Sequence, residues 1–174
     1  MNQEGSKFNA AKEAVKLVKN GMLVGLGTGS TAKIAVDLIG EKLSENFQIV
    51  GMTTSIQTKK QAEKLGIELI DIDSTDSIDI AIDGADEVSP DLSLIKGLGG
   101  ALLREKKVER KAKELIIIVD ESKIVDQLGV GFLPVEVSIK EHKLTQKQIA
   151  SLGCKAEVRV EPDSLPFLTD NGNY

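Results

Sequence analysis

The sequence predicts an α/β fold, with a mostly parallel β-sheet, helices on both of its faces, and a small α+β unit after it. Over residues 1–130, short apolar runs alternate with amphipathic stretches of helical period. Polar or glycine-rich loops follow several of these runs, as at the ligand-binding edge of open α/β sheets. The pattern changes after Gly129-Val130-Gly131. We therefore expect a Rossmann-like domain over 1–130 and the start of a small, apparently incomplete domain over 131–174.

Helices are expected where apolar residues recur every three or four positions. Ser6 is a candidate N-cap for the first helix, Asn20-Gly21 ends it, and Gly66 ends the third. The expected helices cover 7–19, 31–44, a stretch ending near 65, 99–114 and 145–152. The expected strands cover 22–26, 48–52, 67–70, 78–82, 92–95, 115–119, 134–138 and 156–160.

Composition excludes several classes of function. The formal net charge of -5 and an aromatic content of 3% disfavour nucleic-acid binding. Cys154 is the single cysteine and His142 the single histidine, so neither an internal disulfide nor a zinc site of the usual type can form. The N-terminus lacks the apolar stretch of a signal peptide, and the longest aliphatic run, 115–119, is too short to span a bilayer. We expect a cytoplasmic protein with no nucleic-acid or membrane partner, whose chemistry uses carboxylates, lysines and hydroxyls.

A glycine-rich segment, Gly25-Leu-Gly27-Thr-Gly29-Ser30-Thr31, spans the end of the first predicted strand and the loop after it. Glycines let the backbone approach a ligand, and the free N–H groups of the next helix favour an anion such as phosphate. We expect Ser30 or Thr31 to cap that helix. A dinucleotide fingerprint would need glycine at Ser30, and an ATP-binding loop would need Gly-Lys-Ser/Thr. The loop indicates a phosphate or hydroxyl cradle without a nucleotide signature, and a plain tight turn is the alternative.

Three acids in five residues, Asp83-Gly84-Ala85-Asp86-Glu87, follow another apolar strand. Such a cluster could bind a metal, orient sugar hydroxyls or shuttle protons, and the alternative is a solvated acidic turn. Its place at the end of a strand favours a function.

Glu105 lies within the apolar stripe of the predicted helix 99–114, beside Ala101, Val108 and Ala112. Partial burial would raise the pKa of its carboxyl group and suit a general base; the alternative is a glutamate at the margin of the stripe that reaches water.

Two lysines are candidates for holding negative charge. Lys96 precedes the helix that carries Glu105 and could hold a phosphate or a developing oxyanion. Lys123, after Asp120, has the same interpretation. An ordinary surface lysine is the alternative for each.

Together, seven segments resemble the type A ribose-5-phosphate isomerases. Each is weak alone, but they occur in the order and approximate spacing of that family and cover the chain from end to end. They are GLGTGSTA (25–32), TTS (53–55), DGADEV (83–88), KGLGGALLREK (96–106), DESK (120–123), PVEV (134–137) and TDNGN (169–173).

The resemblance implies a reversible interconversion of D-ribose 5-phosphate and D-ribulose 5-phosphate in the pentose phosphate pathway, without metal or cofactor. Glu105 would move a proton between C1 and C2 through an enediolate. Asp83 would assist ring opening and proton transfer at the oxygens, and Lys96 would stabilise the enediolate. A homodimer or homotetramer is implied. The implied substrate-binding residues are Thr28, Gly29, Ser30, Thr31, Asp83, Gly84, Ala85, Asp86, Lys96, Gly97, Leu98, Gly99 and Lys123.

The chain departs from the family pattern at two points. Leu98 stands where many members have glycine, so either its side chain points away from the substrate or the pocket is altered. The sequence ends at Tyr174, soon after the last matching segment, whereas members of the family continue through further strands and a helix.

Other functions stay open. A non-catalytic sugar-phosphate sensor of related fold would keep the cradle and could dispense with Glu105. Another sugar-phosphate isomerase or deaminase is a third possibility, and a dinucleotide-binding oxidoreductase ranks last.

Overall fold

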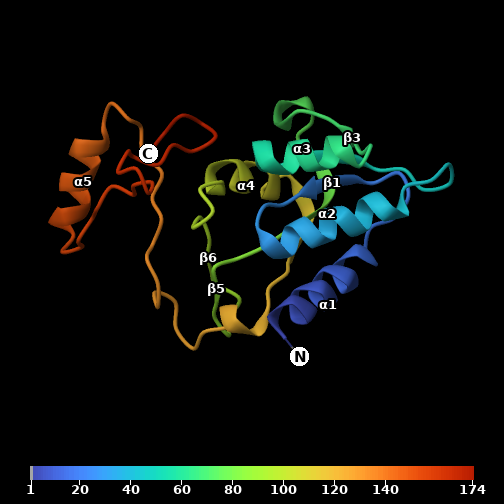
Figure 1. The fold of residues 1–174 in the computed structure, drawn as a ribbon, viewed down its shortest axis with the longest axis horizontal. Coiled ribbons are helices and arrows are strands. Elements are labelled where there is room, and N and C mark those ends of the chain that lie inside the picture. Colours follow the sequence, from blue (N-terminus) through green and yellow to red (C-terminus); the bar gives the residue numbers. More distant parts are fainter. Residues whose placement is uncertain (1) are drawn as a thin grey trace. The chain divides into compact units, whose positions relative to one another are not determined.

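The computed structural model describes residues 2–174, which divide after Leu133 into two compact units. The first unit is built on a parallel sheet (Figure 1). Its five strands lie in the order β3-β2-β1-β4-β7. This confirms the predicted α/β class. The strands are β1 (Leu23–Leu26), β2 (Val50–Thr53), β3 (Glu68–Leu69), β4 (Ile78–Asp83) and β7 (Ala112–Ile117), with a separate antiparallel hairpin of β5 (Glu87–Val88) and β6 (Leu94–Ile95). The helices are α1 (Gln3–Val15), α2 (Ser30–Lys42), α3 (Ile56–Lys64), α4 (Leu102–Glu109) and α5 (His142–Ser151), with short 3₁₀ turns at Ile72–Ser74 and Glu121–Lys123.

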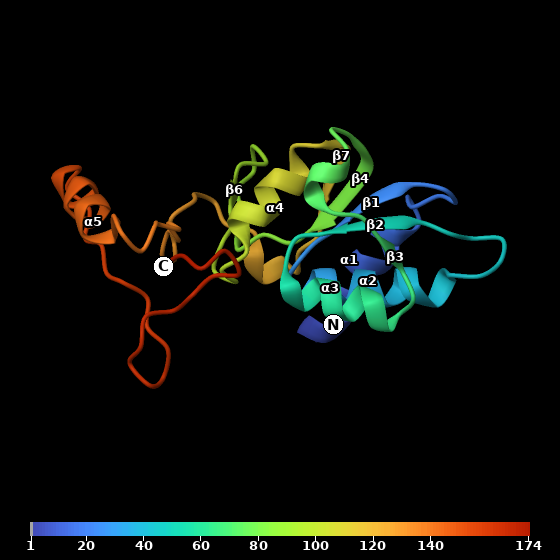
Figure 2. The same cartoon turned by 90° about the horizontal axis from the view of Figure 1, so that it is seen from above.

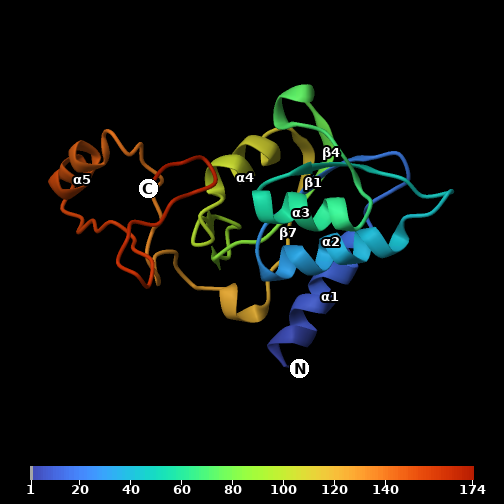
Figure 3. The ribbon, with the colours of Figure 1, turned by 45° about the horizontal axis from the view of Figure 1, so that its top comes forward.

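Each face of the sheet carries its own apolar core, because successive side chains of a strand point to opposite faces. Ile80 and Ile82 of β4 pack in the cluster that includes buried residues of α1, α2 and α3. Ala81, between them, packs with Met52 and with Val108 of α4. Figure 2 shows α1, α2 and α3 on one side of the sheet and α4 on the other, and Figure 3 shows α2 lying between α1 and α3. The prediction of helices on both faces is confirmed.

The strand order reverses at β1, which pairs with β2 on one side and with β4 on the other. Ligands in open α/β sheets bind at such a reversal, beyond the carboxyl ends of the strands. The chain leaving β1 stays beside β4, since the N–H group of Gly27 donates to the carbonyl of Ile82 at 3.0 Å. The glycine-rich loop and the acidic segment, more than fifty residues apart in sequence, therefore meet at one edge.

The first helix begins earlier than predicted. Ser6 lies inside α1, and the N-cap is Asn2, whose Oδ1 accepts a hydrogen bond from Gly5 N at 2.9 Å. The regular helix ends at Val15, before Asn20-Gly21. The start of the helix thus follows from a local cap at Asn2, which our prediction did not include.

The predicted helix 99–114 is wrong at both ends. Gly97 and Gly100 have φ of 112° and 76°, and they form a turn closed by Gly100 N donating to the Gly97 carbonyl at 2.9 Å. At the other end, Ala112 begins β7, where it pairs with Ile78 of β4. An edge strand tolerates exposed polar side chains on residues such as Lys113, which made the stretch look helical.

The second unit, Pro134–Tyr174, contains α5 and extended or turning chain. The predicted strands 134–138 and 156–160 do not form. Val137 exchanges backbone hydrogen bonds with Tyr174 at 2.7 and 3.0 Å, and Val160 forms a single bridge with Pro166, which has no N–H group to extend a ladder. No helix within residues 2–174 combines the length and hydrophobicity needed to cross a membrane.

Candidate active site

The β1–α2 loop is shaped to expose backbone N–H groups. The N-cap of α2 is Gly29, with φ of 109° and no side-chain cap, so our expectation that Ser30 or Thr31 would cap the helix is wrong. Both residues lie in the first helical turn, where N–H groups have no partner within the helix. The first turn of α2 can therefore donate both N–H and hydroxyl groups to an anion.

Hydroxyl groups from the end of β2 hold this loop in place. Thr54 is buried, and its Oγ1 donates to the carbonyl of Leu26 at 3.1 Å and lies 2.7 Å from Thr28 Oγ1. Thr58 Oγ1 donates to the carbonyl of Gly27 at 2.9 Å, while Ser55 caps α3 by accepting from Thr58 N. Thr54 of the TTS segment and Thr58 of α3 thus hold the loop in place.

Asp83, at the end of β4, is only 1% exposed. Its Oδ1 accepts hydrogen bonds from Thr28 N at 3.0 Å and Gly84 N at 2.7 Å, while its Oδ2 lies 3.4 Å from Lys96 Nζ. Burial raises the pKa of Asp83 to about 7; Lys96 opposes that rise and Glu105 adds to it. The solvated acidic turn is therefore excluded for Asp83, which can hold a proton near neutral pH.

Lys96 is buried at the centre of a charged cluster and is not a surface lysine. Its Nζ donates to the carbonyl of Gly84 at 2.5 Å and lies 3.2 Å from Glu105 Oε2 and 3.2 Å from Glu109 Oε1. Desolvation lowers the pKa of Lys96, but the carboxylates of Asp83, Glu105 and Glu109 outweigh it and the pKa is raised. Lys96 therefore stays an ammonium ion.

The three carboxylates around Lys96 have the donor set of a metal site, with oxygens within 4.8 Å of one another. The ammonium group lies within 3.4 Å of an oxygen of each one. The positive charge that such a cluster needs is thus supplied by the chain itself.

Glu105 is held in the first turn of α4 and is 5% exposed. Burial raises the pKa of its carboxyl group; the charge and hydrogen bond of Lys96 oppose the rise, and Glu109 and Asp86 add to it. The alternative of a marginal glutamate that reaches water is excluded. A carboxylate with a raised pKa facing a pocket is suited to general-base chemistry.

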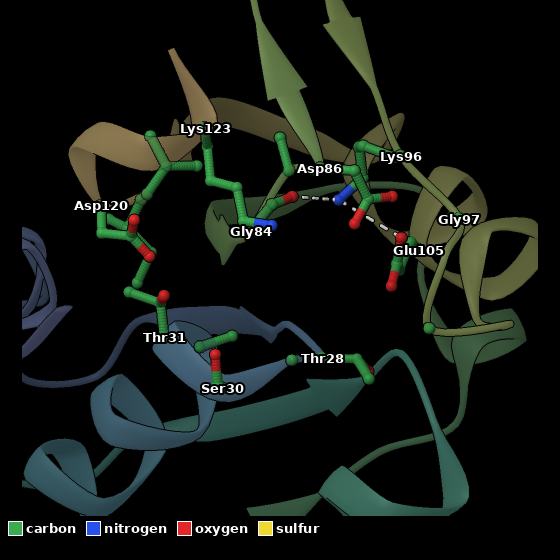
Figure 4. A pocket seen from close by; sticks show the side chains of 16 residues that line it. Thr28, Ser30, Thr31, Gly84, Asp86, Lys96, Gly97, Glu105, Asp120 and Lys123 are labelled. Carbon is green, nitrogen blue, oxygen red and sulfur yellow. Dashed lines mark hydrogen bonds and ion pairs between the residues drawn. The ribbon is translucent and has the colours of Figure 1, made fainter. Parts of the chain in front are cut away.

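A pocket joins these elements, and every residue that lines it belongs to the first unit (Figure 4). Thr28, Ser30 and Thr31 lie along one side, Lys96 and Glu105 along the other, and Asp120 and Lys123 at the end away from Glu105. The lining residues are Thr28, Gly29, Ser30, Thr31, Ala32, Gly84, Ala85, Asp86, Lys96, Gly97, Gly99, Glu105, Ile118, Val119, Asp120 and Lys123.

Two predicted site residues are absent from that lining within the described chain. Asp83 is buried and lies 3.4 Å from Lys96, which does line the pocket. Leu98 has a 43% exposed side chain, and its N–H group donates to Asp86 Oδ2 at 2.9 Å. The backbone at position 98 therefore orients Asp86, while the leucine itself does not line the pocket.

Sequence reasoning missed Asp120 and Glu109. Asp120 is buried at the far end of the pocket, and a hydrogen bond from the Ser122 hydroxyl lowers its pKa, so it is ionised at neutral pH. Glu109 could have been found, because it follows Glu105 by four residues and so lies on the same helical face. Ile118 and Val119 also line the pocket, and no motif indicated them.

The site has two chemically different ends. The α2 N-terminus and Lys123 can hold an anion at one end. At the other end, the Glu105 carboxylate, the Lys96 ammonium and the Asp83 carboxyl group can move protons and stabilise negative charge on oxygen. A phosphorylated compound with a carbonyl group several bonds from its phosphate matches both ends.

Comparison with known proteins gives a consistent result. A family model for ribose 5-phosphate isomerase A (phosphoriboisomerase A) matches residues 50–174. The probable ribose-5-phosphate isomerase 3, chloroplastic, of Arabidopsis thaliana is 46% identical over 182 residues, covering 100% of this chain and 66% of that relative. This chain therefore spans about two thirds of the length of that relative.

Solved structures agree. Ribose 5-phosphate isomerase A from Methanocaldococcus jannaschii superposes with a TM-score of 0.93 and 41% identity, covering 99% of this chain and 78% of that one. A D-ribose-5-phosphate isomerase in complex with phospho-erythronic acid gives a TM-score of 0.92 and 43% identity, covering 99% and 77%. The chain belongs to the ribose 5-phosphate isomerase A family.

Proposed function

We propose that this chain interconverts D-ribose 5-phosphate and D-ribulose 5-phosphate. The observation that carries the proposal is the buried Glu105–Lys96 pair at one end of a pocket whose other end is a helix N-terminus with Lys123. The relatives named above support it, including the one whose structure contains phospho-erythronic acid, a phosphorylated sugar acid. The burial of Glu105 favours this function over a non-catalytic sensor, which would not need a base there.

The proposed reaction moves a proton between two adjacent carbons. The phosphate is held by the first turn of α2 and by Lys123, which places C1 and C2 toward Glu105. Glu105 removes the proton from one carbon and returns it to the other, because a single carboxylate can reach both. Lys96 stabilises the negative charge of the enediolate, and Asp83, protonated near neutral pH, exchanges protons at the oxygens and assists ring opening.

We propose that the reaction requires no metal ion. The charge that a metal would supply at the enediolate is supplied by Lys96, which already lies among the three carboxylates. Treatment with EDTA followed by dialysis should leave the rate of isomerisation unchanged. Inactivation that a divalent ion reverses would contradict this.

Assembly and location stay predictions. We expect a homodimer or homotetramer, which sedimentation of the purified chain would test, and a cytoplasmic protein without nucleic-acid or membrane partners. The named Arabidopsis relative is chloroplastic, so fluorescence localisation of the tagged chain in its own cell is the corresponding test.

The function is tested by incubating the purified, folded chain with D-ribose 5-phosphate and resolving the two sugars by chromatography. We expect conversion to an equilibrium mixture that is also reached from D-ribulose 5-phosphate. D-Ribose, which lacks the phosphate, should react far more slowly because it cannot use the cradle. No conversion of the phosphorylated sugar would overturn the proposal, and equal rates with and without phosphate would contradict the role of the cradle.

A further inference from the structure

Glu109 occupies an unusual position for a residue that does not line the pocket in the described chain. It ends α4, one helical turn after Glu105, and its side chain is only 11% exposed. Its Oε1 is buried and lies 3.2 Å from Lys96 Nζ, the same distance that separates Lys96 from Glu105. Burying a carboxylate is costly unless it is paired with an opposite charge, and here that charge is Lys96.

The cluster holds more negative than positive charge. Lys96 has three N–H donors, and the Gly84 carbonyl occupies one at 2.5 Å. Oxygens of Asp83, Glu105 and Glu109 all lie within 3.4 Å of this one ammonium nitrogen, and those of Asp83 and Glu109 have no hydrogen-bond partner among the described residues. Adjacent carboxylates disfavour each other's ionisation, so the third acid changes how strongly the others hold protons.

We propose that Glu109 is a positioning residue for the isomerisation, acting through Lys96 and Glu105 without touching the substrate. This rests on the proposed function. Its carboxylate holds the Lys96 ammonium beside Glu105, and its negative charge makes Glu105 a stronger base while favouring the charged form of Lys96.

The direction of the effect follows from the groups that face the pair. Lys96 and Glu105 are faced by Asp83 from β4, by Asp86 from the following loop and by Glu109 from α4. Glu109 raises the pKa of Glu105 and also that of Lys96. Removing its charge should therefore lower both pKa values and move both limbs of the pH–kcat profile to lower pH.

The test compares the parent with Glu109→Gln, Glu109→Asp and a control, Glu114→Gln, which changes an exposed glutamate of β7. The titration of the Glu105 side-chain carbon is followed by ¹³C NMR in substrate-free protein and assigned with Glu105→Gln. We expect a lower midpoint in Glu109→Gln, a smaller shift in the same direction in Glu109→Asp, and no shift in the control. In parallel, kcat of Glu109→Gln should fall by about tenfold with KM nearly unchanged, because a misplaced catalytic group costs turnover more than binding.

The titration and the activity separate two kinds of failure. The inference is overturned if Glu105 titrates at the same midpoint in Glu109→Gln as in the parent. It is also overturned if kcat falls equally at every pH, so that both limbs of the pH–kcat profile stay where they are in the parent. A parent that does not isomerise ribose 5-phosphate overturns the proposed function, while the substrate-free titration still decides whether Glu109 acts on Glu105. If Glu109→Gln does not fold, the shift in Glu109→Asp decides the matter.

Discussion

The ammonium nitrogen of Lys96 lies 3.2 Å from a carboxylate oxygen of Glu105, and both side chains are buried. The pair joins a group able to take a proton to a group able to stabilise the negative charge that remains. The two residues come from different elements, the segment after β6 and the first turn of α4, joined by the glycine turn 97–100.

Asp83 should make the chain less stable as the pH rises. Its folded pKa is about 7, against an ordinary value of 3.8, so between these pH values the folded chain holds a proton that the unfolded chain has released. The free energy of unfolding therefore falls as pH rises through that window. In Asp83→Asn the decrease between pH 5 and pH 8, measured by urea denaturation, should be smaller than in the parent.

Asp79→Asn is the matched control, because the hydrogen bond from Lys113 lowers the pKa of Asp79. The contribution of Asp79 to the free energy of unfolding therefore changes with pH in the opposite direction to that of Asp83. An unchanged pH dependence in Asp83→Asn would show that Asp83 does not hold a proton in the folded chain.

Lys96→Met should destabilise the fold by about 3–5 kcal/mol at pH 8, because it leaves buried carboxylates without their counter-charge. The loss should be smaller at pH 5, where those carboxyl groups can be protonated. Lys113→Met removes an exposed lysine paired with Asp79 and should cost less than about 1 kcal/mol. Equal urea midpoints for the two variants would contradict the buried cluster.

Gly27→Ala should damage the fold and the site together. A Cβ atom at position 27 would lie 2.4 Å from Asp83 Oδ1 and from the Ile82 carbonyl oxygen, so the strand end or the carboxylate must move. We expect a loss of about 1–3 kcal/mol in urea denaturation, as for other overpacked positions. Gly99→Ala, whose Cβ would meet nothing within 4 Å, is the control. Parent-like stability in Gly27→Ala would show that this close approach is relaxed in solution.

Most of the first unit could be predicted because its signals are local. The parallel sheet follows from apolar runs alternating with helical periods, and the position of Glu105 follows from the apolar stripe that it shares with Val108. The sheet is observed, and Glu105 and Val108 are both buried residues of α4. The strand predicted at 115–119 is found as part of β7, but the first half of β7 was less visible, since Lys113 and Glu114 give it the polarity of a helix surface.

The charge balance of the site could not be predicted, because it depends on distances between separate elements. Lys96 and Asp83 were found as single candidates, but their 3.4 Å separation and the convergence of Glu109 on the same ammonium group come from tertiary structure. In the second unit, residue types typical of strands predicted strands at 134–138 and 156–160. A strand also needs a hydrogen-bonding partner, which the propensity of its residues does not reveal.

The most direct test of the central claim compares the parent chain with Glu105→Gln in the conversion of D-ribose 5-phosphate, with Glu114→Gln as the control. Glutamine keeps the size and polarity of Glu105 but cannot take a proton. We expect Glu105→Gln to bind the substrate while turning over at least about a thousandfold more slowly, in the range that general-base catalysis contributes. The control should match the parent. Near-parent turnover by folded Glu105→Gln would contradict the assignment of Glu105 as the base.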